Sequence, residues 1–417
     1  MDTSKNNSVI EALKKLYVRI SILSLSNGTL SPILPYLLIL SGGGAFESGL
    51  FQSLNNLFNS IGQVVWGRVS DLIGRRKILL VIGVLALIII SFPLTVLIFL
   101  NNLTPYIIIA LSSINTLLTS TSTPVTTSVI IDIAPYTRRS HVYSLHSSLS
   151  TLFTLTGNII ATTILFLAHQ YIGFCLVSLL SLISAFIALA YTLSIPSSVI
   201  DVKNMSLKKN FIETFIIYFK GISIAMSNPR FKTFVLINTF YNFALSIAWP
   251  LFPISQVKVL KMTPYQVVIL SIVSNTTITI GQYIAGRYIP KHRYRLYALL
   301  NRFGLIAVPL VYAFASNAIH LYILGVHTGL ISGIANIIFA LYIVDCANRC
   351  DRATYIGVYG TLTGMASFIG SFIGGLVSSI IIENMGIIEG LKTMYLIATF
   401  ARFLMALIVF KMKEFIL

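Results

Sequence analysis

The sequence predicts an all-α integral membrane protein with twelve transmembrane helices in two six-helix bundles related by pseudo-two-fold symmetry. The first observation is the composition: 56% of the 417 residues are hydrophobic, only 10% are charged, and the mean hydropathy is +0.87. About a quarter of the residues of a soluble domain are usually charged, so this chain cannot cover a water-facing surface along its length. The other two observations are a series of apolar segments of membrane-spanning length and a repeat between the two halves.

Apolar segments of about twenty residues recur from end to end, and this is the length that a helix needs to cross a bilayer. The twelve predicted spans are 16–40, 48–66, 78–100, 105–131, 142–167, 171–194, 232–254, 265–287, 296–316, 319–344, 355–382 and 391–410. Most connections are very short, so neighbouring helices must be antiparallel. The spans divide the chain into an N-terminal six-helix bundle (1–195), a linker (196–230) and a C-terminal six-helix bundle (231–417).

The linker carries Phe211, Phe215 and Phe219 at helical spacing, with lysines nearby. This pattern predicts an amphipathic helix that lies on the cytoplasmic face of the membrane. A thirteenth span is the alternative, but Glu213 and Lys220 interrupt it and would make the number of spans odd.

The placement of the cations predicts the orientation. The net charge is +17, from 29 Lys and Arg against 12 Asp and Glu, which in a soluble protein would suggest a nucleic-acid partner. Here only Lys258, Lys261 and Lys392, three of the 29 cations, fall in the odd-numbered connections. Because positive residues favour the cytoplasmic side, both termini are expected there, in a multi-pass protein of the plasma membrane with no nucleic-acid partner.

A repeat relates the two halves. The segment 62–77, GQVVWGRVSDLIGRRK, has a second copy of its first part at 281–287, GQYIAGR, at an offset of 219 residues. Three further pairs follow the same order with similar offsets: Pro32 with Pro250 (218), Asp132 with Asp345 (213) and Gly157 with Gly370 (213). These matches predict a tandem duplication of six helices in parallel orientation.

Residues 67–76, GRVSDLIGRR, resemble the loop motif of the major facilitator superfamily, G-x-x-x-D-[RK]-x-G-R-[RK], which lies between its second and third helices. Leu72 departs from the pattern, where the family usually has a cation. The run from Asp132 to Arg139 resembles the family's pattern at the end of helix four. Residues 370–375, GSFIGG, resemble an antiporter glycine motif, G-P-x-x-G-G, but lie in the wrong half. The equivalent segment in helix five, 157–161, lacks the proline, which weakens an assignment to the antiporters.

The resemblance implies transport by alternating access, in which two bundles rock about a central substrate site. Gating and motif roles are therefore expected for Gly67, Asp71, Gly74, Arg75, Arg76, Asp132 and Arg139. Gly67 would permit close helix contact and Gly74 would make the turn. Asp71 would meet a helix N-terminus or a nearby cation, and Arg75 would pair with Asp132. Alternatively, Arg76 and the following lysine only anchor the loop.

In this architecture helices one, four, seven and ten line the cavity. The expected substrate-cavity residues are Asn27, Asn115, Asn238, Tyr241, Asn242, Trp249, His327 and Asn336. Hydrogen bonding between helices is the alternative for the polar members, and a neutral core histidine is the alternative for His327 as a proton carrier. Arg302 and Arg402 also lie inside spans, and snorkelling or lipid-phosphate binding is expected for them. All twelve acids fall at or outside the membrane surfaces, which argues against export of cationic drugs.

These observations predict a secondary transporter of a small organic solute, and not an enzyme. Export of amphipathic compounds is favoured over uptake or facilitated diffusion of a neutral or anionic metabolite. No phosphate-binding G-x-x-x-x-G-K-[ST] segment is present, so no ATP hydrolysis is expected. The cysteines at 346 and 350 lack further ligands for a metal, so no metal or cofactor is expected. The partners would be the solute, membrane lipids and a coupling proton as an open candidate, with the chain a monomer. A transport-inactive sensor and an intramembrane enzyme are the alternatives of a different class.

Overall fold

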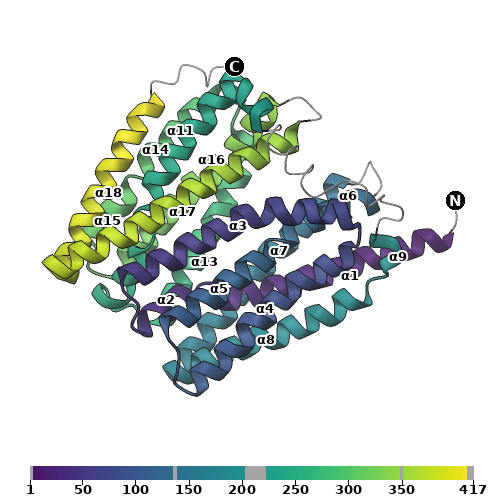
Figure 1. Cartoon of the computed structure of the whole chain (residues 1–417), viewed down its shortest axis with the longest axis horizontal. Coiled ribbons are helices and arrows are strands. Elements are labelled where there is room, and N and C mark those ends of the chain that lie inside the picture. The colour runs from purple at the N-terminus through teal and green to yellow at the C-terminus, as the bar shows by residue number, and fades with distance from the viewer. Residues whose placement is uncertain (1–2, 135–138, 202–221, 348–350, 411–417) are drawn as a thin grey trace. The chain divides into compact units, whose positions relative to one another are not determined.

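The computed structural model describes residues 3–134, 139–201, 222–347 and 351–410, and these form helices with no strand among them (Figure 1). They fall into two compact units. The first consists of residues 1–37 and 61–211, and the second of residues 38–60 and 212–417. The helices α2 (Leu34–Leu40) and α3 (Ala45–Ile73) are divided between the two units.

The first unit is organised around its N-terminal helix. Its remaining helices are α1 (Thr3–Leu30), α4 (Arg76–Phe99), α5 (Pro105–Thr119), α6 (Ser122–Ile133), α7 (Arg139–Leu167), α8 (Gln170–Ser194) and α9 (Ser197–Ile200). Helix α1 packs against α7 and α8, and α4 packs against α5 and α8.

The second unit repeats this scheme. Its helices are α11 (Pro229–Ser246), α12 (Leu251–Ile254), the π-helical turn η2 (Ser255–Val259), α13 (Pro264–Tyr288), the 3₁₀ turn η3 (Lys291–Arg293), α14 (Tyr294–Gly304), α15 (Ala307–Phe314), α16 (Ala318–Cys346), α17 (Arg352–Met385) and α18 (Ile387–Phe410). Helix α11 packs against α17 and α18, α15 packs against α18, and α13 packs against α16.

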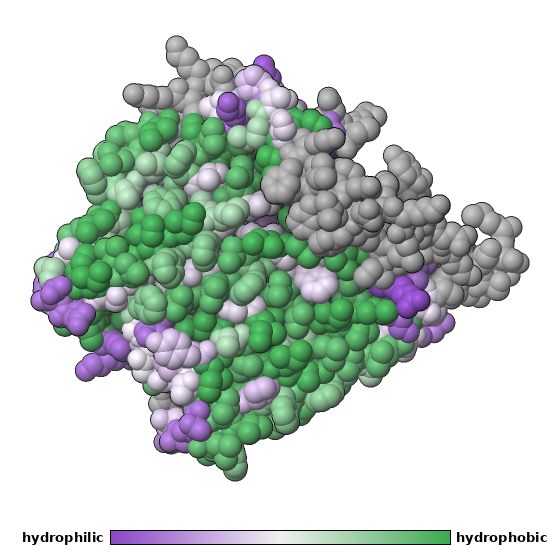
Figure 2. All heavy atoms as spheres, viewed as in Figure 1, coloured by the Kyte–Doolittle hydropathy of each residue, from purple (hydrophilic) through white to green (hydrophobic). Residues whose placement is uncertain are grey.

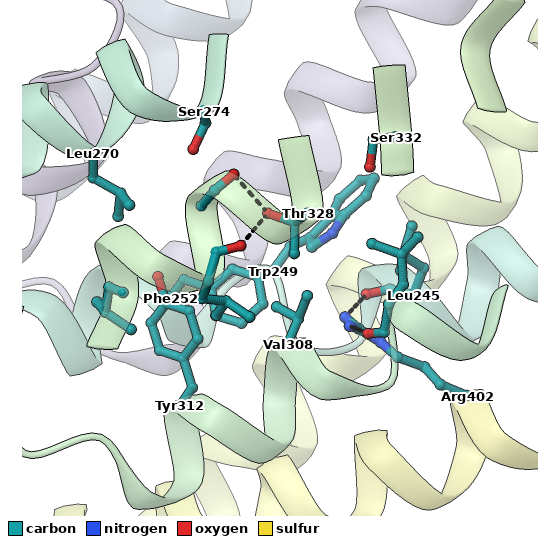
Figure 3. Close-up of a pocket in the computed structure, with 14 residues that line it drawn as sticks. Leu245, Trp249, Phe252, Leu270, Ser274, Val308, Tyr312, Thr328, Ser332 and Arg402 are labelled. Atoms are coloured by element: carbon teal, nitrogen blue, oxygen red, sulfur yellow. Dashed lines mark hydrogen bonds between the residues drawn. The ribbon is translucent and has the colours of Figure 1, made fainter. Parts of the chain in front are cut away.

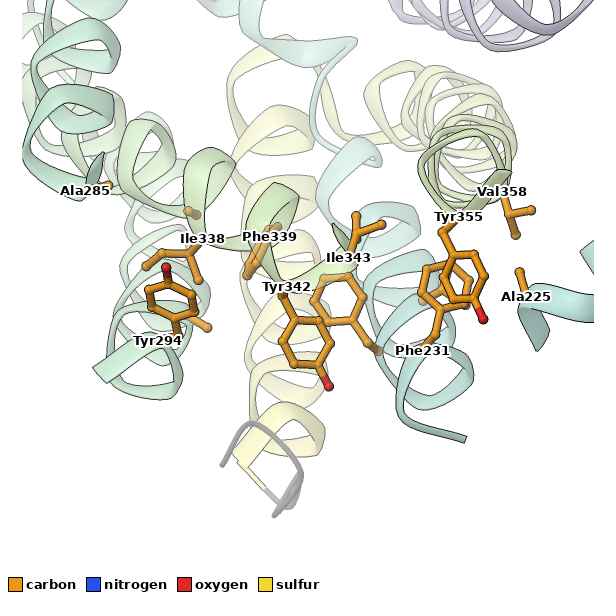
Figure 4. Close-up of a cluster of buried hydrophobic side chains, with 14 of the residues drawn as sticks. Ala225, Phe231, Ala285, Tyr294, Ile338, Phe339, Tyr342, Ile343, Tyr355 and Val358 are labelled. Carbon is orange, nitrogen blue, oxygen red and sulfur yellow. The ribbon is translucent and has the colours of Figure 1, made fainter. Parts of the chain in front are cut away.

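An aromatic cluster closes one end of the second unit (Figure 4). The ring of Phe234 lies 4.7 Å from that of Tyr342, and the ring of Phe231 lies 4.5 Å from that of Tyr355, measured between centroids. These pairs join α11 to α16 and α17, and offset or tilted ring pairs of this kind add to the free energy of apolar burial.

Ten helical segments of the described chain are long and apolar enough to cross a membrane. Large apolar side chains remain exposed on them, among them Phe99, Phe166 and Phe400. Figure 2 shows the face in view covered mostly by hydrophobic residues. A surface of this kind suits contact with lipid, because soluble monomers rarely expose wide apolar patches.

Two of the twelve predicted spans are not among these ten. The span at 48–66 corresponds to α3, whose 29 residues include five Asn and Gln between positions 52 and 63 that lower its hydropathy. The span at 105–131 is interrupted, so that α5 has 15 residues and α6 has 12. The number twelve therefore stays a prediction. The linker helix expected around 202–221 lies outside the described residues.

Prolines explain the interruptions. A proline has no backbone N–H and its ring clashes with the carbonyl four residues earlier, which kinks a helix, as Pro93 can within the continuous α4, or breaks it. The residue four positions before a proline lies in each of four breaks: Ser31 before Pro35, Ser120 before Pro124, Trp249 before Pro253 and Leu305 before Pro309. Carbonyls near these breaks lose their helical N–H partners. At the candidate site, side chains donate to such carbonyls instead.

A close helix contact recurs in the two units. A Cβ atom at Gly157 of α7 would overlap the carbonyl oxygen of Leu25 in α1. In the second unit a Cβ atom at Gly370 of α17 would overlap the carbonyl oxygen of Phe243 in α11. The two glycines differ by the offset of 213 and their partners by 218, both of which occur in the sequence repeat.

Candidate functional site

The loop motif forms the end of α3, a two-residue turn and the start of α4. Gly74 has a φ of +65°, in the left-handed region that favours glycine, and its N–H donates to the carbonyl of Ser70 at 3.1 Å. The prediction that Gly74 makes the turn is therefore confirmed. Arg75 follows it as the exposed residue that precedes α4.

The tight helix contact in this motif lies five residues before Gly67. A Cβ atom at Gly67 would meet only the Cβ of Pro124, at 3.6 Å, which is an ordinary van der Waals distance. A Cβ atom at Gly62 would overlap the hydroxyl oxygen of Ser120, which lies in the break between α5 and α6. The close approach expected at Gly67 is thus made by Gly62.

The cations of the motif point in different directions. Arg76 is buried, and its Nη1 lies 3.5 Å from the carbonyl of Ser128 in α6. Arg76 is thus more than a surface anchor of the loop. The side chains of Asp71, Asp132 and Arg139 lie outside the described residues, so their gating roles and the pairing of Arg75 with Asp132 stay predictions.

Asp201, which sequence reasoning placed only at the membrane surface, holds the start of α4. Its carboxylate accepts the N–H of Lys77 at 3.0 Å, and the ammonium of Lys77 donates to the carbonyl of Leu193 at 2.7 Å. A carboxylate is favourable at a helix N-terminus, where N–H groups lack helical partners. The first acid after the sixth predicted span, seven residues beyond its end, was the signal for this contact.

The predicted cavity residues of the first unit lie on α1 and α5. Asn27 is half-buried, and so is Asn115, whose buried Oδ1 has no hydrogen-bond donor among the described residues. Both positions are compatible with a polar cavity and with helix packing.

The predicted cavity residues of the second unit divide into three groups. Asn238 and Tyr241 are buried within the helix packing, and the amide of Asn242 donates to the carbonyl of Asn238 at 2.8 Å. Trp249 lines a cavity. His327 and Asn336 of α16 are exposed, and the Nε2 of His327 lies 3.3 Å from the carbonyl oxygen of Gly304.

The expectation that Arg302 and Arg402 snorkel toward lipid headgroups is wrong. Arg302 is 5% exposed and Arg402 is 1% exposed. The guanidinium of Arg302 donates to the amide oxygen of Asn238, and its central carbon lies 3.9 Å from the ring centroid of Tyr241. Arg402 donates from Nη1 to the carbonyl of Leu305 at 2.8 Å and from Nη2 to the carbonyl of Leu245 at 2.7 Å.

The broken helices are the physical reason for this burial. Leu305 lies four residues before Pro309, so its carbonyl cannot accept a helical N–H from that position. The N–H of Trp249, which would bond Leu245 in a continuous helix, instead donates to the carbonyl of Ser246 at 3.1 Å. Arg402 donates to both of these carbonyls in place of their helical partners, and the carbonyl of Leu305 also accepts the N–H of Val308 at 3.3 Å.

The first unit contains a buried arginine that sequence reasoning did not single out. Arg19 of α1 is fully buried, and it donates to the hydroxyl of Thr192 in α8 and to the carbonyl of Leu80 in α4, both at 3.2 Å. A buried arginine thus links three helices in each unit. Arg19 links α1, α4 and α8, and Arg402 links α11, α14 and α18, which correspond to them in the sequence repeat. The available signal was an arginine near the start of the predicted span 16–40.

A cavity of about 330 Å³ lies within the second unit (Figure 3). It is lined by Leu245, Trp249, Phe252, Leu270, Ser274, Leu305, Val308, Tyr312, Leu321, Leu324, Gly325, Thr328, Ser332 and Arg402. They come from α11, α12 and the break between them, from α13, from the break between α14 and α15, and from α15, α16 and α18. Phe252 and Tyr312 stack with centroids 4.4 Å apart, and Gln256 donates to the Tyr312 hydroxyl at 2.9 Å. The wall is therefore mostly apolar and held in place by ring stacking and hydrogen bonds.

Comparison with known proteins matches residues 20–371 to the Major Facilitator Superfamily. The structure of the nucleoside transporter NupG is similar with a TM-score of 0.72 at 15% identity, over 96% of this chain and 100% of that one. The structure of a peptide transporter, POT, is similar with a TM-score of 0.72 at 12% identity, over the whole of both chains. That of the human organic anion transporter MFSD10 has a TM-score of 0.58 at 14% identity, over 94% and 99% of the chains. Comparison with curated protein sequences finds no significant match.

Proposed function

Because the chain belongs to the major facilitator superfamily, we propose that it is a secondary transporter that moves a small organic solute across the plasma membrane by alternating access. The family match over residues 20–371 is the observation that carries this proposal. The similar structures of nucleoside, peptide and organic anion transporters support transport as the activity, and at their low identities they bear on the fold and not on the solute.

The moving parts would be the two six-helix bundles, 1–195 and 231–417, joined by the linker. Two observations made within the units support such a duplication. The first unit pairs α1 with α7 and α8, and the second pairs α11 with α17 and α18. The glycine contact of Gly157 recurs at Gly370. Two copies of one bundle are the arrangement that alternating access uses.

The solute we propose is amphipathic. The cavity of the second unit combines three aromatic rings with hydroxyls and a single charged side chain, and binding pockets for small molecules are mostly apolar with a few polar groups. A compound of this kind enters a bilayer without a carrier, so a protein that binds it changes its distribution mainly by exporting it. Uptake or facilitated diffusion of a neutral or anionic metabolite would use the same cavity with the opposite net flux.

The cytoplasmic gate we propose is the loop between α3 and α4. Gly74 makes its turn, and Asp71 precedes that turn within a run of cations. A single carboxylate there can hold a helix N-terminus or a cation of the other bundle in one conformation and release it in the other. The proton is the coupling ion we propose to test, with His327 as the titratable candidate inside a span.

Reconstitution into proteoliposomes tests this function. We expect saturable flux of at least one class among labelled amphipathic carboxylates, neutral alcohols and ammonium compounds, with and without an imposed pH gradient. Asp71→Lys should reduce that flux about tenfold, as a loss of ~1.4 kcal/mol of stabilisation along the transport cycle would. Its size-exclusion profile serves as the control for folding.

Two outcomes would count against the proposal. Unchanged flux in Asp71→Lys would contradict the proposed gating role of Asp71. Binding without saturable flux of any class would favour the transport-inactive sensor. Net flux in sealed vesicles of known orientation separates export from uptake.

A further inference from the structure

The cavity of the second unit contains one charged residue among those that line it, Arg402. This side chain comes from α18 and reaches the breaks of α11 and α14, where it donates to the carbonyls of Leu245 and Leu305 (Figure 3). A guanidinium has five N–H donors, and these two bonds use two of them. The Nε of Arg402 is buried and has no acceptor among the described residues.

The charge of Arg402 is also uncompensated within the described chain. Its hydrogen-bond acceptors are two neutral carbonyls, and the ionisable groups that influence it most are the phenols of Tyr241 and Tyr395. Burial of an unpaired cation is costly, and a carboxylate that reaches it offsets that cost by Coulomb attraction and charge-assisted hydrogen bonds. The unused N–H donors of Arg402 and its positive charge thus both favour a carboxylate as the ligand group.

The rest of the cavity fits an apolar body of modest size. Trp249, Phe252 and Tyr312 supply aromatic surface, and Phe252 and Tyr312 are fixed by their mutual stacking. The hydroxyl of Thr328 donates to the carbonyl of Leu324 at 2.9 Å, which leaves its oxygen as an acceptor. A volume of about 330 Å³ is at the lower end of ligand pockets, which hold about 300–1,000 Å³.

We propose that this cavity binds a small organic carboxylate, whose anionic group meets Arg402 and whose apolar body lies against Trp249, Phe252 and Tyr312. The inference rests on the proposed function in one respect, because it names the substrate class of that transporter. It also agrees with the direction proposed above. An amphipathic weak acid crosses a bilayer in its neutral form and is trapped as its anion on the more alkaline side, from which a carrier can remove it.

The chain offers a direct readout, because it contains two tryptophans, Trp66 and Trp249. Trp66 belongs to the first unit, where its indole N–H donates to the carbonyl of Leu117 at 2.7 Å. In Trp66→Phe the emission therefore comes from Trp249 alone. The probes are cyclohexanecarboxylate, its neutral amide and cyclohexylmethylammonium, which do not absorb at the wavelengths that excite tryptophan.

We expect cyclohexanecarboxylate to shift the emission of Trp249 saturably in the purified full-length protein. The amide should bind about tenfold more weakly, in line with the difference between a charge-assisted and a neutral hydrogen bond. The ammonium compound should not bind. In Trp249→Phe, which retains Trp66, the emission should not respond. Equal affinities for the carboxylate and the amide, or no saturable response to either, would overturn the proposal.

Two variants test the site itself. Arg402→Gln should abolish the preference for the carboxylate over the amide. Since this variant also removes two structural hydrogen bonds, Val308→Phe provides an independent test, because it fills the cavity and leaves Arg402 in place. Carboxylate binding should be lost in Val308→Phe, and retention would contradict the assignment. Saturable flux of a neutral solute without carboxylate binding would contradict this inference and would still support the proposed transport function.

Discussion

At the scale of single residues, Tyr241 and Arg402 perform the same task with different side chains. Each donates to a carbonyl that a helix break leaves without its usual partner. The N–H of Ile306 bonds the carbonyl of Phe303 at 3.1 Å, so the carbonyl of Arg302 is free to accept the Tyr241 hydroxyl at 2.9 Å. The two side chains therefore satisfy carbonyls at the same interruption, one in the last turn of α14 and one in the break before α15.

Tyr241→Phe should lower the free energy of unfolding by about 1 kcal/mol, because it leaves the buried carbonyl of Arg302 without its donor. The ring and its contact with the guanidinium remain. Reversible unfolding in mixed detergent measures the change. Tyr143→Phe is the matched control, since it removes the same hydroxyl from an exposed side chain and should change nothing. Equal stabilities of the two variants would mean that the carbonyl finds another donor.

Sequence reasoning could identify such residues but not their surroundings. Arg302 and Arg402 are visible in the sequence as cations inside predicted spans. Whether such a cation faces lipid or neighbouring helices depends on the packing of several helices, which no local pattern encodes. The polarity of Asn238 predicts a place in the cavity, but this side chain is 3% exposed and bonded to Arg302. Gly74 was predicted correctly, because a positive φ in a short turn is a local property.

At the scale of helices, the repeated segment GQxxxGR has the same contact pattern in both units. Its first glycine lies at a tight contact and its second does not. Gly62 would strike Ser120 if it carried a Cβ, and Gly281 would strike the carbonyl oxygen of Leu330 in α16. At Gly286 a Cβ would meet nothing within 4 Å.

The breaks of α5, α11 and α14 were not predicted, although each lies four residues before a proline, because the apolar pattern alone suggests continuous spans.

Gly281→Ala and Gly286→Ala form a matched pair within α13. An added methyl at 281 overlaps backbone atoms of α16, which cannot move without separating the two helices. At 286 the methyl is free and the variant gains helix propensity, worth ~1 kcal/mol. We expect Gly281→Ala to lower the thermal midpoint in detergent and the transport rate, and Gly286→Ala to leave both unchanged or to raise the midpoint. If both variants behave alike, the contact between α13 and α16 accommodates the added methyl group, which would contradict this prediction.

At the scale of the whole molecule, sidedness follows from the distribution of cations. Three of the 29 fall in the odd-numbered predicted connections, and the positive-inside bias predicts that those connections lie outside the cell. The structure contributes suitable positions for a test. Asn102 is exposed after α4, and His292 is exposed in the turn η3 between α13 and α14.

Single-cysteine labelling at these two positions tests the orientation and the number of spans together. In a background with Cys175, Cys346 and Cys350 replaced by serine, a membrane-impermeant maleimide should label Asn102→Cys in intact cells. It should label His292→Cys only after permeabilisation, and the cysteine-free chain should not react.

Five predicted spans separate the two positions, so they must lie on opposite sides of the membrane. If the linker crossed the bilayer, six spans would separate them and both would label from one side, because an even number of crossings returns the chain to the same face. Labelling of His292→Cys alone in intact cells would reverse the orientation and place most of the cations outside, against the bias from which it was predicted.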